Sequence, residues 1–171
     1  MSKNEKQKRY DITSEHLQQL LKTKPDWQIM LSRNGMECEN CGAVSYEYID
    51  GVAHATTYGL ESAYQHPEFE LILNLPDNDI GYLLNLFGRL VREGIKFEDG
   101  MLIGGVFMDC DVRLEKIPKD NNLLRIVIPD GRNRWPEDKH CDPSYAVQAK
   151  PMGELTRTKP RLGNPYQQFT S

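Results

Sequence analysis

The sequence has no apolar run of the about 20 residues that a membrane-spanning helix needs. Its first nine residues are mostly polar and lack the apolar core of a secretory signal peptide. The chain also lacks a positive net charge: at −4, it has no overall field that attracts nucleic acid. We therefore expect a cytoplasmic protein with no membrane segment, and we do not expect nucleic acid as its partner.

Familiar catalytic motifs are missing as well. No Gly-x-Ser-x-Gly motif is present, and neither Ser45 nor Ser62 has a context typical of a catalytic triad. Gly100, Gly104 and Gly105 do not form a Gly-x-Gly-x-x-Gly pattern, and no Lys-Ser/Thr pair follows them. We interpret these three residues as turn glycines.

Cysteine is scarce, and the sequence contains one close pair. Cys38 and Cys41 enclose Glu-Asn and are followed by Gly42. In a cytosolic protein such a pair is more often a metal-ligand pair, a redox pair or plain thiols than a structural disulfide. The turn resembles one knuckle of a zinc ribbon, but a tetrahedral site needs two more ligands. Either His140 or Cys141 could supply one from a distance, or two copies of the chain could pair their knuckles.

The chain is long enough to bury a core without support from a metal or disulfides. Its 171 residues, 39% of them hydrophobic and 27% charged, are typical of a single globular domain. Charged residues 1–10 predict a flexible N-terminal arm, and residues 150–171, rich in Pro, Gly and basic side chains, predict a C-terminal tail. The domain is then expected at residues 11–149.

Hydrophobic periodicity predicts two principal helices. Thr13 or Ser14 can cap a helix that ends near Lys22. A second, longer helix begins after Pro76, carries one continuous apolar stripe, and ends at Gly94.

Strand-like runs are more numerous than helices. The expected strands are residues 27–31, 44–49, 52–58, 68–75, 106–114 and 123–128. The pair Asp50-Gly51 predicts a type I′ hairpin between the second and third of these, and the apolar run 68–75 predicts a central strand covered on both faces. Alternation along 106–114 predicts that Cys110 is a core thiol. Short connections favour an α+β domain with a mixed, mainly antiparallel sheet.

The loop before the central strand is the strongest candidate for a functional site. It carries Glu61, His66 and Glu68 between two expected strands. A histidine beside a carboxylate can serve as a general base or a metal ligand. The alternative is structural: Pro67 fixes the turn, and His66 holds it through a hydrogen bond to the backbone.

The strand that precedes this loop adds polar side chains. Alternation places His54, Thr56 and Tyr58 on one face of the strand. These three side chains could line a pocket together with His66. The alternative is the solvent-exposed polar face of an antiparallel sheet.

A second candidate region follows the last expected strand. It contains Asp130, Arg132, Arg134 and Trp135. Arginines beside an aromatic ring suit an anion that also stacks, such as a nucleotide, and they suit a protein interface equally well. The alternative is a loop whose tryptophan packs back onto the core.

Four segments, in this order, resemble the bacterial and phage family called "domain of unknown function 4262". They are Thr57-Tyr-Gly-Leu60, His66-Pro-Glu68, the helix end Arg92-Glu-Gly94 with Phe97 and Gly100 after it, and Ile128–Pro136. The resemblance covers about residues 52–145. The chain departs from the family pattern in the order of Thr57-Tyr58, in the order of Trp135-Pro136, and in the stretch Cys38–Ile49, which resembles an insertion. The family setting implies an accessory or conflict-related role in a phage or bacterium, and its name states no reaction.

Three functional hypotheses follow. The leading one is a binding module, with no required cofactor, for a small anionic or nucleotide-like ligand or a protein partner near His66 and the 132–135 loop. The second is a hydrolase in which His54, His66, Glu61 and Glu68 gather a metal or an acid–base pair to activate water. The third is a zinc-stapled interaction domain, and a homo-oligomer is compatible with all three.

The zinc-stapled domain makes a direct prediction. The purified full chain should contain zinc by elemental mass spectrometry, and Cys38→Ser should release the metal and lower the melting temperature, because a structural zinc site contributes to folding free energy. Cys110→Ser, which removes a thiol outside the pair, is the matched control. Zinc-free protein, or a Cys38→Ser variant that melts like the wild type, would exclude this hypothesis.

Overall fold

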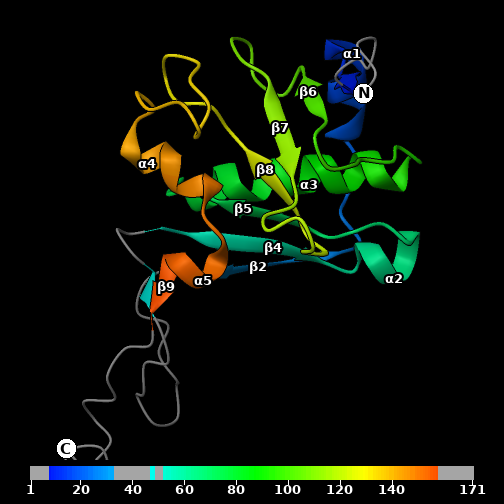
Figure 1. The fold of residues 1–171 in the computed structure, drawn as a ribbon. Helices are drawn as coiled ribbons and strands as arrows, with labels where there is room; N and C mark the ends of the chain where they lie inside the picture. Colours follow the sequence, from blue (N-terminus) through cyan, green and yellow to red (C-terminus); the bar gives the residue numbers. More distant parts are fainter. Residues whose placement is uncertain (1–7, 33–46, 49–51, 158–171) are drawn as a thin grey trace, which may run out of the picture.

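The computed structural model describes residues 8–32, 47–48 and 52–157 of the chain. They form one α+β domain around a seven-stranded mixed sheet (Figure 1). In spatial order its strands are β1 (Arg9–Asp11), β6 (Leu102–Gly104), β7 (Val112–Glu115), β8 (Leu124–Val127), β5 (Phe69–Ile72), β4 (His54–Tyr58) and β2 (Gln28–Ser32). In a second, two-stranded sheet, β3 (Glu47–Tyr48) pairs with β9 (Thr156–Arg157). Among the described helices, none has the length and apolar character needed to cross a membrane.

The large sheet is mainly antiparallel, as the short connections predict. Neighbouring strands run antiparallel in β2/β4, β4/β5, β6/β7 and β7/β8, and parallel in β1/β6 and β5/β8. All four residues of β5 are buried between β4 and β8. The expected central strand is therefore confirmed.

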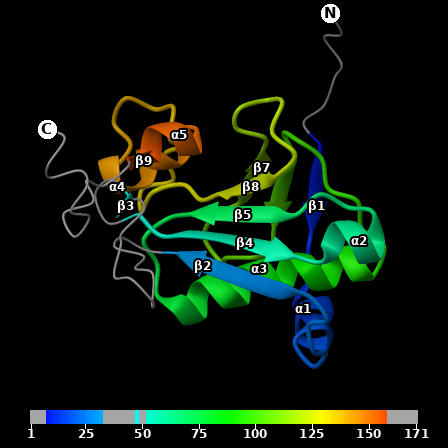
Figure 2. The same cartoon turned by 90° about the horizontal axis from the view of Figure 1, so that it is seen from below.

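Both expected helices are present. They are α1 (Ser14–Leu20) and α3 (Asp77–Arg92). The described residues also form shorter helical segments: α2 (Leu60–Tyr64), α4 (Pro143–Ala146), the 3-10 turn η2 (Val147–Ala149) and α5 (Met152–Leu155). Thr13 caps α1 by accepting a hydrogen bond from the His16 N–H. The apolar stripe of α3 is buried, and the helix contacts β4 and β5 across one face of the sheet (Figure 2). Phe69 and Leu71 of β5 point into this main core.

The opposite face of the sheet is covered in part by the C-terminal segment, which we define as residues 142–157. Ile72 of β5 points to this face and packs with Val52 and with Leu155 of α5 in a second, smaller apolar cluster. The strand alternation of β5 therefore serves two cores, one on each face.

A fully buried arginine fastens this segment to the sheet. The Nε atom of Arg125 in β8 donates to Glu70 Oε1 in β5 at 3.0 Å. Its Nη1 atom donates to the carbonyl oxygens of Gln148 and Lys150, both at 2.6 Å. Glu70 also contacts His54 Nε2 at 3.0 Å. Burial alone would raise the pKa of Glu70, but the bonds from His54 and Arg125 outweigh it and hold the pKa below its ordinary value.

The predicted hairpin around Asp50-Gly51 is wrong in its pairing. Strand β4 pairs with β2 on one side and β5 on the other, so no edge of β4 is left for the preceding strand. The described part of that strand, β3, pairs with β9 instead. Asp50 and Gly51 themselves lie outside the described residues.

The single strand predicted at 106–114 is also wrong. The chain leaves β6 at Gly104, bends, and begins β7 at Val112. Gly105 has a φ of +89°, and a Cβ atom there would overlap the Ile12 carbonyl oxygen, so the bend requires glycine. Cys110 is half-buried in the resulting loop and is not a core thiol. The interpretation of Gly105 as a turn glycine is confirmed.

The boundaries of the folded region also differ from those expected. Arg9 and Tyr10, assigned from sequence to the flexible arm, form β1 and pair in parallel with β6. Leu155, assigned to the tail, is buried in the second apolar cluster. These residues are ordered because each supplies backbone bonds or apolar surface to the sheet.

Two glycines of α3 provide a matched test of its packing. A Cβ atom at Gly88 would overlap the Trp27 indole, which a 2.8 Å hydrogen bond from Nε1 to Asn85 Oδ1 holds in place. Gly88→Ala should therefore lower the free energy of unfolding by about 1–3 kcal/mol. Gly81 has no atom near its added Cβ, so Gly81→Ala should raise that free energy by about 0.5–1 kcal/mol through helix propensity. Urea denaturation measures both, and equal effects would contradict this packing.

Candidate functional site

His66 is a structural residue in the core. Its side chain is buried, its Nδ1–H donates to the Pro67 carbonyl at 2.8 Å, and its Nε2 accepts the Phe97 N–H at 3.0 Å. The ring also stacks on Phe69, with the ring centroids 5.4 Å apart. Burial lowers the pKa of His66, so the neutral ring is favoured. Both ring nitrogens are occupied, as the structural alternative required.

Glu68 is equally occupied. Its carboxylate accepts the Thr57 hydroxyl at 2.8 Å. It also accepts the backbone N–H groups of Gly59, Leu60 and Glu61, at 3.0, 3.1 and 3.0 Å. These three donors belong to the first turn of α2, whose N-cap residue Gly59 has no side chain to supply this bond. Glu68 therefore caps a helix that lies before it in the chain.

The four groups of the hydrolase hypothesis do not converge. His66 contacts Phe69 on the α3 face of the sheet, whereas His54 contacts Glu70 on the opposite face. Glu61 is exposed. Across residues 8–32, 47–48 and 52–157, no group of three or more His, Cys, Asp or Glu side chains is placed to hold a metal ion.

Strand alternation in β4 is as predicted. His54 and Thr56 are half-buried and Tyr58 is 64% exposed, whereas the intervening Ala55 and Thr57 are buried. His54, Thr56 and Tyr58 line neither of the two cavities described below.

Asp130 organises the second candidate region. Its Oδ1 accepts the backbone N–H groups of Arg132 and Arg134, at 2.9 and 3.0 Å. Its Oδ2 accepts Arg134 Nε at 3.0 Å and the Asp142 N–H at 2.9 Å. Burial acts to raise the pKa of Asp130, but these donors outweigh it and hold the pKa far below its usual range. Arg134 is thus neutralised inside the loop, while Arg132 remains exposed.

Trp135 lies against a cation of the protein itself. The guanidinium carbon of Arg113 is 4.5 Å from the ring centroid. Glu137 holds that guanidinium through two hydrogen bonds of 2.8 and 2.7 Å. One face of the indole is therefore already covered by a cation.

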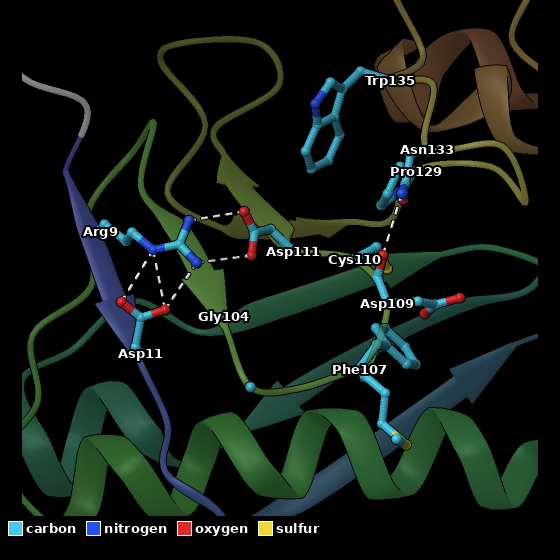
Figure 3. A pocket seen from close by; sticks show the side chains of 12 residues that line it. Arg9, Asp11, Gly104, Phe107, Asp109, Cys110, Asp111, Pro129, Asn133 and Trp135 are labelled. Carbon is cyan, nitrogen blue, oxygen red and sulfur yellow. Dashed lines mark hydrogen bonds and ion pairs between the residues drawn. The ribbon is translucent and has the colours of Figure 1, made fainter.

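A cavity of about 470 Å³ lies beside Trp135 (Figure 3), and we call it the acidic cavity. It is lined by Arg9, Asp11, Gly104, Gly105, Phe107, Met108, Asp109, Cys110, Asp111, Pro129, Asn133 and Trp135. Arg9 lies between two carboxylates: it bonds Asp11 at 3.0 Å and Asp111 at 2.8 and 2.9 Å. The bond to Arg9 lowers the pKa of Asp111. The single cation of this lining is therefore saturated by its neighbours.

A second cavity of about 380 Å³ adjoins the first, and we call it the apolar cavity. Both cavities share the wall formed by Phe107, Asp109, Cys110, Pro129 and Asn133. The remaining lining residues are Leu73, Leu75, Asp79, Tyr82, Leu83, Val106, Ile128, Asp130, Gly131 and Tyr145. This cavity lies where the parallel strands β5 and β8 end, a common position for ligands in sheets with parallel strands.

Two carboxylates in this lining are free of internal partners. Within the described part of the chain, no ion pair or side-chain hydrogen bond involves Asp79 or Asp109. Figure 3 shows Asp109 pointing away from the Arg9–Asp111 pair. Among the residues that the structure describes, no Lys, Arg or His lines the apolar cavity. Its electrostatic character is therefore negative.

The sequence located part of this site. Of the residues predicted to bind a ligand, Asp130 and Trp135 line the cavities, and His54, Tyr58, Glu61, His66, Glu68, Arg132 and Arg134 do not. The loop between β6 and β7 was missed because its alternating residues resemble a strand. Gly104-Gly105 was the available signal, since paired glycines end a strand more often than they extend it.

The zinc ligands proposed from sequence lie elsewhere. Cys38 and Cys41 are outside the described residues. Cys141 is buried, and burial raises the pKa of its thiol. His140 is exposed.

Comparisons with protein-family models, with curated proteins and with solved structures found no match to this chain. The family resemblance therefore stays a prediction. The fold and cavities define an α+β protein with two adjoining, ligand-sized cavities beside its parallel strand pair.

The neutral His66 makes stability depend on pH. Its pKa is lowered from 6.5 in the folded protein, so below about pH 6.5 the unfolded chain binds a proton that the folded chain resists. The free energy of unfolding should therefore fall as pH drops below 6.5 toward the folded pKa. His66→Gln should lose this part of the slope, and the exposed-site control His140→Gln should keep it. Chemical denaturation at a series of pH values measures the slopes, and equal slopes for wild type and His66→Gln would contradict a buried neutral ring.

Proposed function

We propose that this protein is a non-catalytic, cytoplasmic binding module for a small ligand with an apolar body and a cationic group. The single observation that carries the proposal is that Asp79 and Asp109 line the apolar cavity without a side-chain partner among the described residues, while no described cation lines that cavity. The accessory role in a phage or bacterium that the resemblance implies is part of this proposal.

The charge of the lining supports a cationic ligand. Asp79 lies in the first turn of α3 and Asp109 in the loop between β6 and β7, so two separate elements direct carboxylates to one cavity. An ammonium or guanidinium group can donate hydrogen bonds to such carboxylates, and charged bonds of this kind are stronger than neutral ones. A quaternary ammonium, which has no N–H, is less well served.

The shape of the lining supports an apolar body. The lining includes Leu73, Leu75 and Leu83 as well as the rings of Tyr82 and Tyr145. The cavity volume of about 380 Å³ lies within the range of small-molecule sites. A ring or short aliphatic chain would remove this surface from water.

The cavities argue against the anionic or nucleotide-like ligand expected from sequence. Arg134 is bound by Asp130, and Arg9 is bound by Asp11 and Asp111. An anion would have to displace these carboxylates, which carry its own sign of charge.

Titration calorimetry with matched amines and acids tests the proposal. Tyramine, tryptamine and benzamidine should bind at pH 7, and phenylacetate and adenine nucleotides should not. Asp109→Asn should weaken amine binding about tenfold or more, because it removes one charge-assisted hydrogen bond.

The matched control is Asp120→Asn, which makes the same change at an exposed carboxylate outside both cavities. It should leave amine binding unchanged. Binding of a nucleotide, or amine binding that both variants weaken alike, would overturn the proposal.

A further inference from the structure

Strand β2 is one of the two edges of the large sheet, and it differs from the other edge. Among the described residues β2 pairs with β4 alone, and β1 forms the opposite edge. Two of the three β1 residues, Arg9 and Asp11, are charged. Charged side chains on an edge strand discourage pairing with another chain. All five residues of β2, Gln-Ile-Met-Leu-Ser, are uncharged, and none is proline.

The outward surface of β2 is apolar at its centre. Met30 is 60% exposed, and Tyr58 of the neighbouring strand is 64% exposed. Because Met30 pairs with Thr56 in the β2/β4 register, Met30 and Tyr58 lie on the same face, diagonally across the two strands. Ile29 and Leu31 point to the other face and pack against the main core.

We propose that β2 is a self-association strand, which pairs antiparallel with β2 of a second copy of this chain. The order of polar and apolar side chains along β2 is symmetric about Met30: Ile29 and Leu31 are apolar, and Gln28 and Ser32 at the two ends are polar. An antiparallel strand pair with its two-fold axis at Met30 would place Gln28 opposite Ser32 of the second copy and Ile29 opposite Leu31 of the second copy. Polar residues would therefore pair with polar residues and apolar residues with apolar residues along β2, and no charged side chain of β2 would be buried.

This pairing would bury apolar side chains on both faces of the paired β2 strands. The half-buried Ile29 and Leu31 extend the main core across the new strand pair, and the two exposed Met30 side chains pack together beside Tyr58. The two sheets become one continuous sheet, and the edge of β2 visible in Figure 2 disappears. The apolar cavity proposed to bind a ligand lies at the ends of β5 and β8, and none of its lining residues belongs to β2. This inference is therefore independent of the proposed function.

Sedimentation velocity of the full chain over a range of concentrations tests the association. The mass should rise with concentration from 19.7 kDa toward twice that value. Met30→Lys should weaken the dimer about tenfold or more, because like charges directly opposite each other on paired strands repel. Its melting temperature at low concentration should not change, since Met30 is exposed in the single chain. Met108→Lys, the same change at a fully exposed methionine between β6 and β7, should dimerise like the wild type.

Cysteine cross-linking tests the register. In Met30→Cys the two new thiols would lie opposite each other, within the reach of a disulfide, and mild oxidation should join residue 30 to residue 30. Gln28→Cys should not cross-link to itself, because its opposite position is Ser32 of the second copy. Peptide mass spectrometry identifies the linked residues.

Three results would overturn the proposal: a chain that stays monomeric at all concentrations, a dimer that Met30→Lys leaves intact, and Gln28→Cys protein that cross-links as fast as Met30→Cys protein. A chain that stays monomeric but binds a different protein through β2 would also overturn the proposal.

Discussion

The burial of the Arg125 guanidinium is the constraint on which the rest of the structure depends. Removing such a charge from water costs several kcal/mol unless it is paired and hydrogen-bonded. Glu70 supplies the opposite charge from β5, and the carbonyls of Gln148 and Lys150 supply two acceptors from the C-terminal segment. These two carbonyls therefore hold the C-terminal segment against β8. The same segment carries Tyr145, which lines the apolar cavity.

The number of hydrogen bonds that a charged side chain makes within the protein distinguishes structural charges from candidate functional ones. Asp130 receives four hydrogen bonds, and with these it fixes the loop that carries Trp135. Asp79 and Asp109 receive none from other described side chains, although they line the same cavity as Asp130. A ligand can gain only from groups that the protein has not already satisfied. The negative, apolar site follows from this unequal distribution of partners.

His66 and Glu68 show how far a polar motif can be interpreted from sequence. A histidine and a glutamate in a loop between strands have the residue types of a catalytic pair, and the sequence left a structural role open as the alternative. In the structure Glu68 caps α2, and His66 accepts a hydrogen bond from the Phe97 N–H. The hydrogen bonds of this motif come from Thr57, Gly59 and Phe97, which lie up to 31 residues away. No local pattern reports such partners, so the motif could not be identified as saturated before folding.

Local periodicity by itself determined α3, the buried β5, the cap of α1 and the α+β class, because these depend on neighbours within a few residues along the chain. Tertiary structure alone decided that β4 lies between β2 and β5, that Gly105 bends the chain away from a strand, and that the cavities form at all. The walls of the apolar cavity come from segments 73–83, 106–110 and 128–145, which lie far apart in the sequence and meet beside the parallel pair β5/β8. The energies that select such long-range pairings come from burial and from satisfied charges, and neither is visible in the order of the residues.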